Sequence, residues 1–114
     1  TSIGGELRLV LLDEVTSLEG LSNLTSVGTR LTISDMDSLT SLDGLEGITS
    51  LSEELHMGYN DLLIDISGIS NLTSIGGDLT IYHHDALCQS VVESYISAIS
   101  IGGTITTVWN NDDC

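Results

Sequence analysis

The side chains of this chain best suited to chemistry are three histidines, two cysteines and seventeen carboxylates. The histidines are His56, His83 and His84, and the cysteines are Cys88 and Cys114. Nucleophilic catalysis needs a nucleophile within reach of a base, and no spacing in the sequence singles out such a pair. The motifs Gly-x-Ser-x-Gly, Gly-Lys-Ser, Cys-x-x-Cys and His-Glu-x-x-His are all missing from it. We therefore expect a protein that is not an enzyme.

Metal binding is the next chemistry that the carboxylates suggest. Asp35 and Asp37 lie close in sequence, as do Asp112 and Asp113, and carboxylate oxygens are the ligands that calcium prefers. The carboxylates do not follow the spacing of a known calcium loop. Solvated carboxylates are the simpler interpretation, and we expect neither a metal nor a cofactor.

The charge of the chain restricts its partners. Acidic residues outnumber basic ones by 17 to 2, which gives a net charge of -15. Such a surface repels nucleic acid and anionic lipid, because both are bound through basic side chains. No apolar stretch reaches the roughly 18 residues of a membrane span, so we expect no membrane insertion. A strongly acidic surface is tolerated best where salt screens it, which fits a secreted protein.

The sequence repeats itself every 24 residues, as Leu-Thr-Ser-Val-Gly at 24–28, Ile-Thr-Ser-Leu-Ser at 48–52 and Leu-Thr-Ser-Ile-Gly at 72–76 show. Apolar columns follow the same step; one holds Leu7, Leu31, Leu55 and Leu79, and another holds Leu9, Ile33, Met57 and Ile81. Within a turn, Leu31 and Ile33 have the spacing of a half-buried strand. The next apolar residues, Leu39, Leu42, Leu45, Ile48 and Leu51, recur every third position, which fits a coil of short extended segments and corners.

These patterns predict a mainly β protein, a leucine-rich β-solenoid whose stacked turns bury each other's apolar residues. One parallel sheet is expected near residues 6–10, 30–34, 54–58, 78–82 and 104–108. The chain is then a single domain over 1–114, with repeats over 1–85 and a C-terminal cap over 86–114. An aspartate recurs at one corner of each turn, at Asp13, Asp37, Asp61 and Asp85. We expect these side chains to form a structural ladder that accepts hydrogen bonds from backbone N–H groups.

The cap is predicted from a break in the repeat after Asp85. Residues 86–99 read as a helix with Asp85 as its N-cap. Gly76 to Cys88 and Gly102 to Cys114 each span 13 residues, which places the cysteines in neighbouring turns. Strands about 4.8 Å apart suit the Cα separation of a disulfide. We expect a Cys88–Cys114 disulfide, which implies an oxidising compartment; two free buried thiols are the alternative.

The sequence resembles the receptor L-domain family and its bacterial leucine-rich relatives. The resemblance covers residues 1–87 and is clearest in Leu-Asp-Gly-Leu at 42–45 and Ser-Asn-Leu-Thr-Ser-Ile-Gly-Gly-Asp-Leu-Thr-Ile at 70–81. It implies an extracellular protein that binds ligands or helps to assemble receptors. The cysteine-rich modules that flank receptor L domains are missing from this chain, which favours a free-standing secreted or surface protein.

Aromatic residues are expected to gather at one edge of the sheet. The position after each strand holds Leu11, Asp35, Tyr59, His83 and Trp109 in successive turns. We predict a contact patch made of Tyr59, Tyr82, His83, His84 and Trp109, with Arg30 and His56 on the neighbouring sheet face. The alternative is that these rings cover the core at the corner.

We therefore expect an extracellular, non-catalytic interaction or adhesion module. It would bind a protein or glycan through its exposed sheet face and aromatic edge. The alternative is a structural subunit that assembles end to end, as a homo-oligomer, through an uncapped N-terminal turn into a fibre or surface layer.

Overall fold

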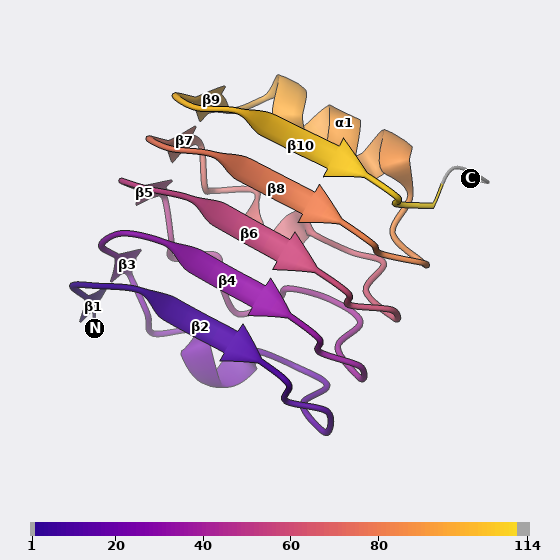
Figure 1. Cartoon of the computed structure of the whole chain (residues 1–114). Coiled ribbons are helices and arrows are strands. Elements are labelled where there is room, and N and C mark those ends of the chain that lie inside the picture. Colours follow the sequence, from indigo (N-terminus) through magenta and orange to yellow (C-terminus); the bar gives the residue numbers. More distant parts are fainter. Residues whose placement is uncertain (1, 112–114) are drawn as a thin grey trace.

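The computed structural model describes residues 2–111 and contains a five-stranded parallel sheet in the order β10-β8-β6-β4-β2. Its strands are β2 (Leu7–Val10), β4 (Leu31–Ser34), β6 (Leu55–Gly58), β8 (Leu79–Tyr82) and β10 (Ile105–Val108). Each strand lies beside the strand from the next turn of the chain (Figure 1). The expectation of a mainly β protein with a parallel sheet is confirmed.

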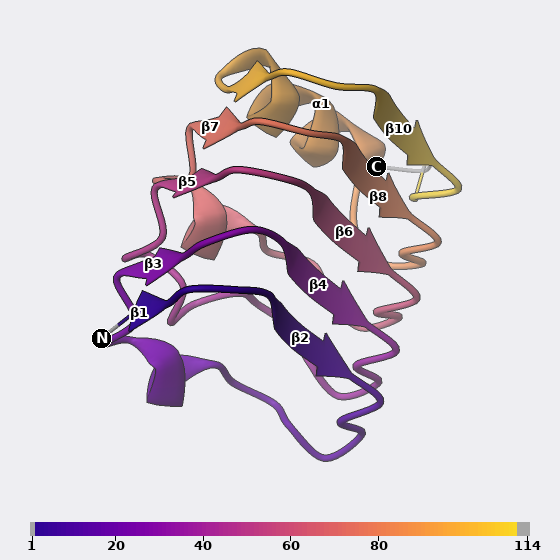
Figure 2. The ribbon, with the colours of Figure 1, turned by 60° about the vertical axis from the view of Figure 1, so that its left-hand side comes forward.

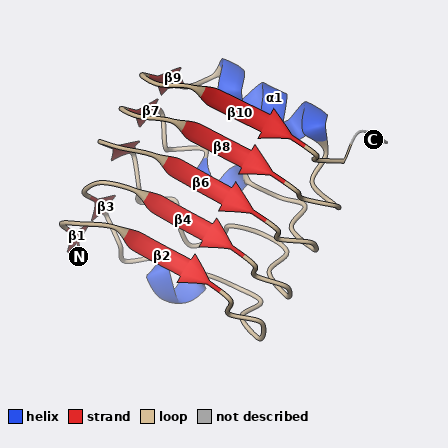
Figure 3. Cartoon of the chain, in the orientation of Figure 1, coloured by secondary structure: helices blue, strands red, loops and turns tan. Residues whose placement is uncertain are grey.

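Shorter strands line a second side of each turn, as Figure 2 shows. β1 (Ser2–Ile3) pairs with β3 (Ser26–Val27), and β7 (Ser74–Ile75) pairs with both β5 (Ser50–Leu51) and β9 (Ser100–Ile101). The helical segments lie behind the main sheet (Figure 3); they are the 3-10 helices Glu19–Leu21 and Ser67–Ile69 and the helix α1 (Gln89–Ser97).

The register of the main sheet reproduces the predicted columns. Leu31 pairs with Leu7 on one side and with Leu55 on the other, each 24 positions away. Leu79 pairs with Ile105, 26 positions on, because the cap inserts two residues. Equivalent side chains therefore stack directly on one another, so a column of like residues forms a continuous core.

The core is aliphatic and follows both spacings read from the sequence. Leu31, Ile33 and Leu55 have no exposed area. The residues at spacing three are equally buried, namely Leu39, Leu42, Leu45 and Ile48. Each such side chain removes apolar surface from water at roughly 25 cal/mol per Å², which makes stacking of turns the main source of stability.

The cap differs from its prediction in its helix. Helix α1 spans Gln89–Ser97, so it is shorter than 86–99. Its N-cap is Cys88, without a side-chain cap hydrogen bond, so the prediction of Asp85 as N-cap was wrong. The reason is that Leu87 continues a buried core column and Cys88 forms a parallel bridge with Asn111, which holds the chain extended up to the helix. The Gln89 N–H then donates to the Asn111 carbonyl at 2.8 Å.

The register of Cys88 also differs from the prediction. Cys88 forms its bridge with Asn111, 23 positions on rather than 26, because the bridge comes three residues after the end of β10 but six residues after the end of β8. Cys114 itself lies outside the described residues, so the disulfide between the two cysteines stays a prediction. Over residues 2–111, no helix has the length and apolar character needed to cross a bilayer.

The turns approach each other closely at Gly44. Its φ is +119°, a conformation open almost solely to glycine, and a Cβ atom there would overlap the Leu18 carbonyl of the preceding turn. Gly20 occupies the same column in the first turn, yet a Cβ atom at Gly20 would meet nothing within 4 Å.

We expect Gly44→Ala to lower the free energy of unfolding by about 2 kcal/mol or more, since it combines backbone strain with an overlap between turns. Gly20→Ala should change it by less than about 1 kcal/mol. Urea unfolding of both variants measures the difference. Equal effects of the two substitutions would contradict the close approach at Gly44.

Candidate functional site

Every turn bends in the same way where the main sheet ends. The residue after each strand has a left-handed backbone with φ between 55° and 59°; these residues are Leu11, Asp35, Tyr59, His83 and Trp109. This conformation costs a residue other than glycine on the order of 1–3 kcal/mol, and Asn and Asp tolerate it best. We call these five residues the corner column. Three of them carry large rings although the backbone favours small or polar residues.

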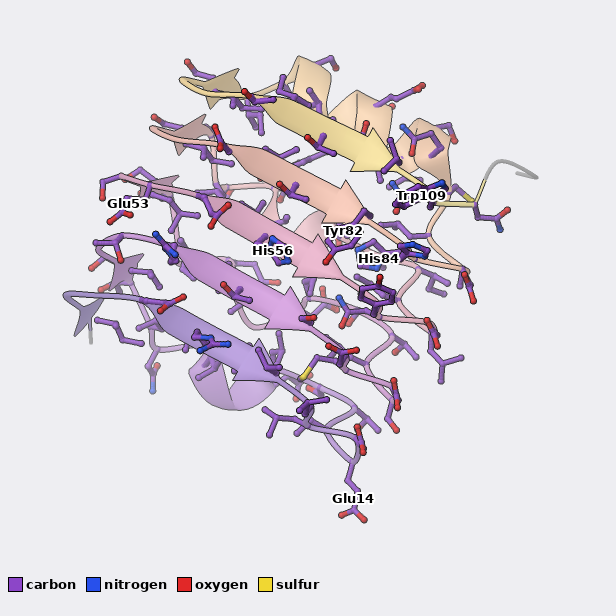
Figure 4. All side chains as sticks on the ribbon, in the orientation of Figure 1. Glu14, Glu53, His56, Tyr82, His84 and Trp109 are labelled. Carbon is purple, nitrogen blue, oxygen red and sulfur yellow. The ribbon has the colours of Figure 1, made fainter. Side chains whose placement is uncertain are left out.

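The rings of the corner column contact one another. Tyr59 and His83 are stacked with centroids 4.6 Å apart and planes 13° apart. Trp109 lies on the far side of the column, with its centroid 4.6 Å from that of His83. The strand residue Tyr82 meets Tyr59 edge to face at 5.3 Å and His56 at 5.4 Å. We call these five side chains the aromatic cluster; His56, Tyr82 and Trp109 are labelled in Figure 4.

The aromatic cluster is open to solvent at its outer rings. Trp109 is 68% exposed and Tyr59 is 42% exposed, whereas the other three rings are partly buried. Two large rings thus present surface outward instead of closing the core. Rings held in place by neighbouring rings lose little conformational freedom on contact with a partner, which suits a recognition surface.

A glycine makes room for the cluster. A Cβ atom on Gly58, the last residue of β6, would lie 2.6 Å from the Tyr82 ring. Gly58 pairs with Tyr82 in the register, so the ring lies flat over the neighbouring strand. Sequence reasoning did not single out Gly58, although it is the one glycine within the main-sheet strands.

The electrostatics of the cluster are set by burial and by nearby acid. Partial burial raises the pKa of the Tyr82 phenol, and the charges of Tyr59 and Asp35 raise it further. The Tyr82 hydroxyl lies 3.4 Å from His56 Nε2. The Asp35 carboxylate thus contributes negative charge near the Tyr82 end of the aromatic cluster.

His84 does not belong to this surface, which corrects the predicted patch. Its side chain is completely buried, because the left-handed turn at His83, which leaves the His83 ring stacked on Tyr59, directs the next residue into the core. His84 Nδ1 lies 3.5 Å from the Asn60 carbonyl oxygen, and its Nε2 has no hydrogen-bond partner among the described residues. Burial lowers the pKa of His84; the carbonyls of Asn60 and Met57 oppose this shift.

His84 is part of a buried polar column with Asn60 and Asn110. Asn60 Oδ1 accepts from the Met36 N–H at 3.0 Å, and Asn60 Nδ2 donates to the Ile33 carbonyl at 3.0 Å. Asn110 Nδ2 likewise donates to the Ile81 carbonyl at 3.1 Å. The side chains that bond to the backbone therefore lie one position before the predicted aspartate ladder. The predicted ladder residues Asp13, Asp37, Asp61 and Asp85 are exposed, and within residues 2–111 their carboxylates accept no hydrogen bond from a backbone N–H group.

Arg30 lies away from the aromatic cluster. It precedes β4, whereas Tyr59, His83 and Trp109 follow β6, β8 and β10. Arg30 and these three rings therefore occupy opposite ends of the sheet. Arg30 Nη2 donates to Glu53 Oε1 at 2.9 Å, and Nη1 lies 3.8 Å from Glu54 Oε1. The hydrogen bond from Arg30 to Glu53 is the main reason why the pKa of Arg30 is raised. These residues line a shallow depression with Asp78.

Within residues 2–111, histidine, cysteine and carboxylate side chains form no group of three that could hold a metal ion. No protein family, curated protein or solved structure that was compared with the chain matches it. The case for a functional site therefore rests on the geometry of the aromatic cluster.

We expect His84 to make stability depend on pH. Its pKa is lower in the folded than in the unfolded chain, where it is about 6.5, so acid favours the unfolded chain. The stability contribution of the neutral ring is present above pH 6.5. It is lost as the pH falls below that value, at up to about 1.4 kcal/mol per pH unit.

His84→Asn puts asparagine at a column position that is asparagine in the neighbouring turns, at Asn60 and Asn110. The difference in unfolding free energy between wild type and this variant should therefore change between pH 7.5 and pH 5, with the wild type losing more. Urea unfolding at several pH values measures it, and subtraction removes the pH effects that the two proteins share. A difference that does not vary with pH would rule out the buried neutral histidine.

Proposed function

We propose that this chain is an extracellular, non-catalytic interaction or adhesion module that binds a protein or glycan through its aromatic cluster and the adjoining sheet face. The observation that carries the proposal is the corner column, which holds large exposed rings at positions where the backbone disfavours them. Side chains that act against the local preference of the backbone are found most often where function needs them.

Several features support recognition rather than chemistry. The exposed rings of Tyr59 and Trp109 belong to a row of rings in contact, supported by a rigid five-stranded sheet. Aromatic side chains contribute much of the energy at protein interfaces, because they bury a large area at a small entropic cost. The Tyr82 hydroxyl lies 3.4 Å from His56 Nε2, but burial raises the pKa of Tyr82, which disfavours the phenolate that would act as a nucleophile, so we propose no catalytic role for the cluster.

We further propose that the stacked turns form a leucine-rich solenoid, similar to the receptor L domains and their bacterial relatives, and that a disulfide closes its last turn. Support comes from the repeated register of the main sheet and from the position of Cys88 opposite Asn111, near the C-terminal cysteine in sequence. A disulfide and a surface of net charge -15 both suit a secreted or surface-exposed protein.

The disulfide is checked by mass spectrometry of the unreduced protein, in which we expect a peptide pair linked through Cys88 and Cys114. Reduction should lower the free energy of unfolding by about 3 kcal/mol, because the bond limits the unfolded chain. Alkylation of either cysteine in unreduced, denatured protein would contradict the bond.

A structural subunit remains the second candidate. It is favoured by the first turn, where Leu11 and Leu12 are 68% and 40% exposed beside the edge strand β2. Leu12 occupies the column that is filled by Met36 and Asn60 in the next turns. End-to-end stacking of a second copy would cover it.

The binding function is tested with the double variant Tyr59→Leu and Trp109→Leu. Leucine is the native residue of the corner column at Leu11, so the fold should persist. We expect affinity for partners selected from arrays of glycans and surface proteins to fall about thirtyfold or more, as for interface hot spots. Binding is measured by surface plasmon resonance, with circular dichroism as the folding check.

The matched control is Leu62→Ser with Ile64→Ser, which removes two exposed apolar side chains outside the cluster. Equal losses in both double variants would mean that general stickiness, not the aromatic cluster, causes binding. Light scattering of the wild type separates the two candidates. Open-ended oligomers that Leu12→Asp disperses would favour the structural subunit, and a monomer would favour the binding module.

A further inference from the structure

We propose that the aromatic cluster and Asp35 together bind the guanidinium group of an arginine, so that the partner is a protein with an exposed basic segment. This inference rests on the proposed binding function and names the chemical class of its partner. It is carried by the position of one carboxylate in the corner column and by the charge balance of the whole chain.

Asp35 precedes Tyr59 in the corner column, one turn closer to the N-terminus. The strands before them pair Ser34 with Gly58, and the Asp35 N–H donates to the Gly58 carbonyl at 3.1 Å. Strands in this register are about 4.8 Å apart, so Asp35 and Tyr59 occupy adjacent positions in the corner column. The influence of Asp35 on Tyr82 agrees with this position.

Tyr59 is 42% exposed, and its ring is covered on one face by another ring. His83 is stacked on it from the following turn, so the opposite face is directed along the column to Asp35. The Ser34 hydroxyl donates to Asp35 Oδ2 at 2.8 Å, which orients the carboxylate and leaves Oδ1 for a partner. An aromatic face beside an oriented carboxylate is the arrangement that a guanidinium group fits, because it can stack and donate hydrogen bonds at once.

The chain itself supplies no cation to this carboxylate. It has no lysine and only two arginines. Arg30, which precedes β4, is paired with Glu53 and Glu54, and Arg8, the second residue of β2, lies 4.0 Å from Glu6. Asp35 thus has no arginine partner among the described residues. A cation that pairs with it comes from another molecule.

The overall charge favours the same class of partner. A net charge of -15 attracts a basic segment at long range and speeds its association. A neutral saccharide also stacks on aromatic rings and its hydroxyls donate to carboxylates, but the net charge of the chain would not contribute to its binding. Lysine carries the same charge as arginine, yet its compact and strongly hydrated ammonium group cannot stack on the ring while it pairs with the carboxylate.

The test uses hexa-arginine and hexa-lysine peptides, with blocked termini, at pH 8 and low salt. Isothermal calorimetry gives the affinity, and the fluorescence of Trp109, the only tryptophan of the chain, reports whether the peptide reaches the cluster. We expect hexa-arginine to bind at least about fivefold more tightly than hexa-lysine.

The decisive pair of variants is Asp35→Asn and Asp37→Asn. Each changes the net charge by one unit, and asparagine suits the left-handed backbone of Asp35. We expect Asp35→Asn to weaken hexa-arginine binding about fivefold, and Asp37→Asn to leave it nearly unchanged. Tyr59→Leu should weaken it similarly, whereas Tyr59→Phe keeps the ring and the affinity.

Equal binding of the two peptides, or equal effects of the two aspartate variants, would overturn the inference, since both indicate attraction by net charge alone. The proposed function is judged separately with neutral oligosaccharides. If these bind through Tyr59 and Trp109 while hexa-arginine shows no dependence on Asp35, the binding function stands and the arginine assignment fails.

Discussion

Parallel hydrogen bonding between successive turns, in a register of 24 residues, is the constraint on which the other features depend. Once Leu31 pairs with Leu7 and Leu55, every position of a turn lies beside its equivalents. Apolar positions then form continuous buried columns, and one turn alone cannot bury them. The same register brings Gly44 against the Leu18 carbonyl, where a larger residue would push the turns apart.

The corner column follows from this register. Its members have the same backbone conformation but different side chains. Its five members share one left-handed conformation, so the direction of the chain is the same in each turn. Their side chains differ, from Leu11 through Asp35 to Trp109. A repeated backbone with a variable outward side chain lets neighbouring turns build a surface whose members come from distant parts of the sequence, which is how Tyr59, His83 and Trp109 meet.

The buried polar column shows where the stacking is less complete. Asn60 both accepts and donates, which joins its own turn to the preceding one. His84 cannot reproduce this, because a neutral imidazole offers one donor and one acceptor in a fixed ring. Its Nε2 and the Oδ1 of Asn110 lack partners among the described residues. Such buried groups without a partner lower the stability of the turns that hold them.

The sequence by itself determined the repeat length, the apolar columns, the parallel sheet and the gathering of rings at one edge, because these depend only on which residues recur at a fixed step. Tertiary structure decided what depends on direction and distance. It turned His83 outward and His84 inward, put Arg30 at the far end of the sheet, and gave the backbone-bonding role to Asn60 rather than to the aspartate after it. It also set Cys88 against Asn111, since the length of the final corner is fixed by packing and not by residue counting. Spacing specifies which residues share a column, but only the folded backbone specifies which way each side chain points.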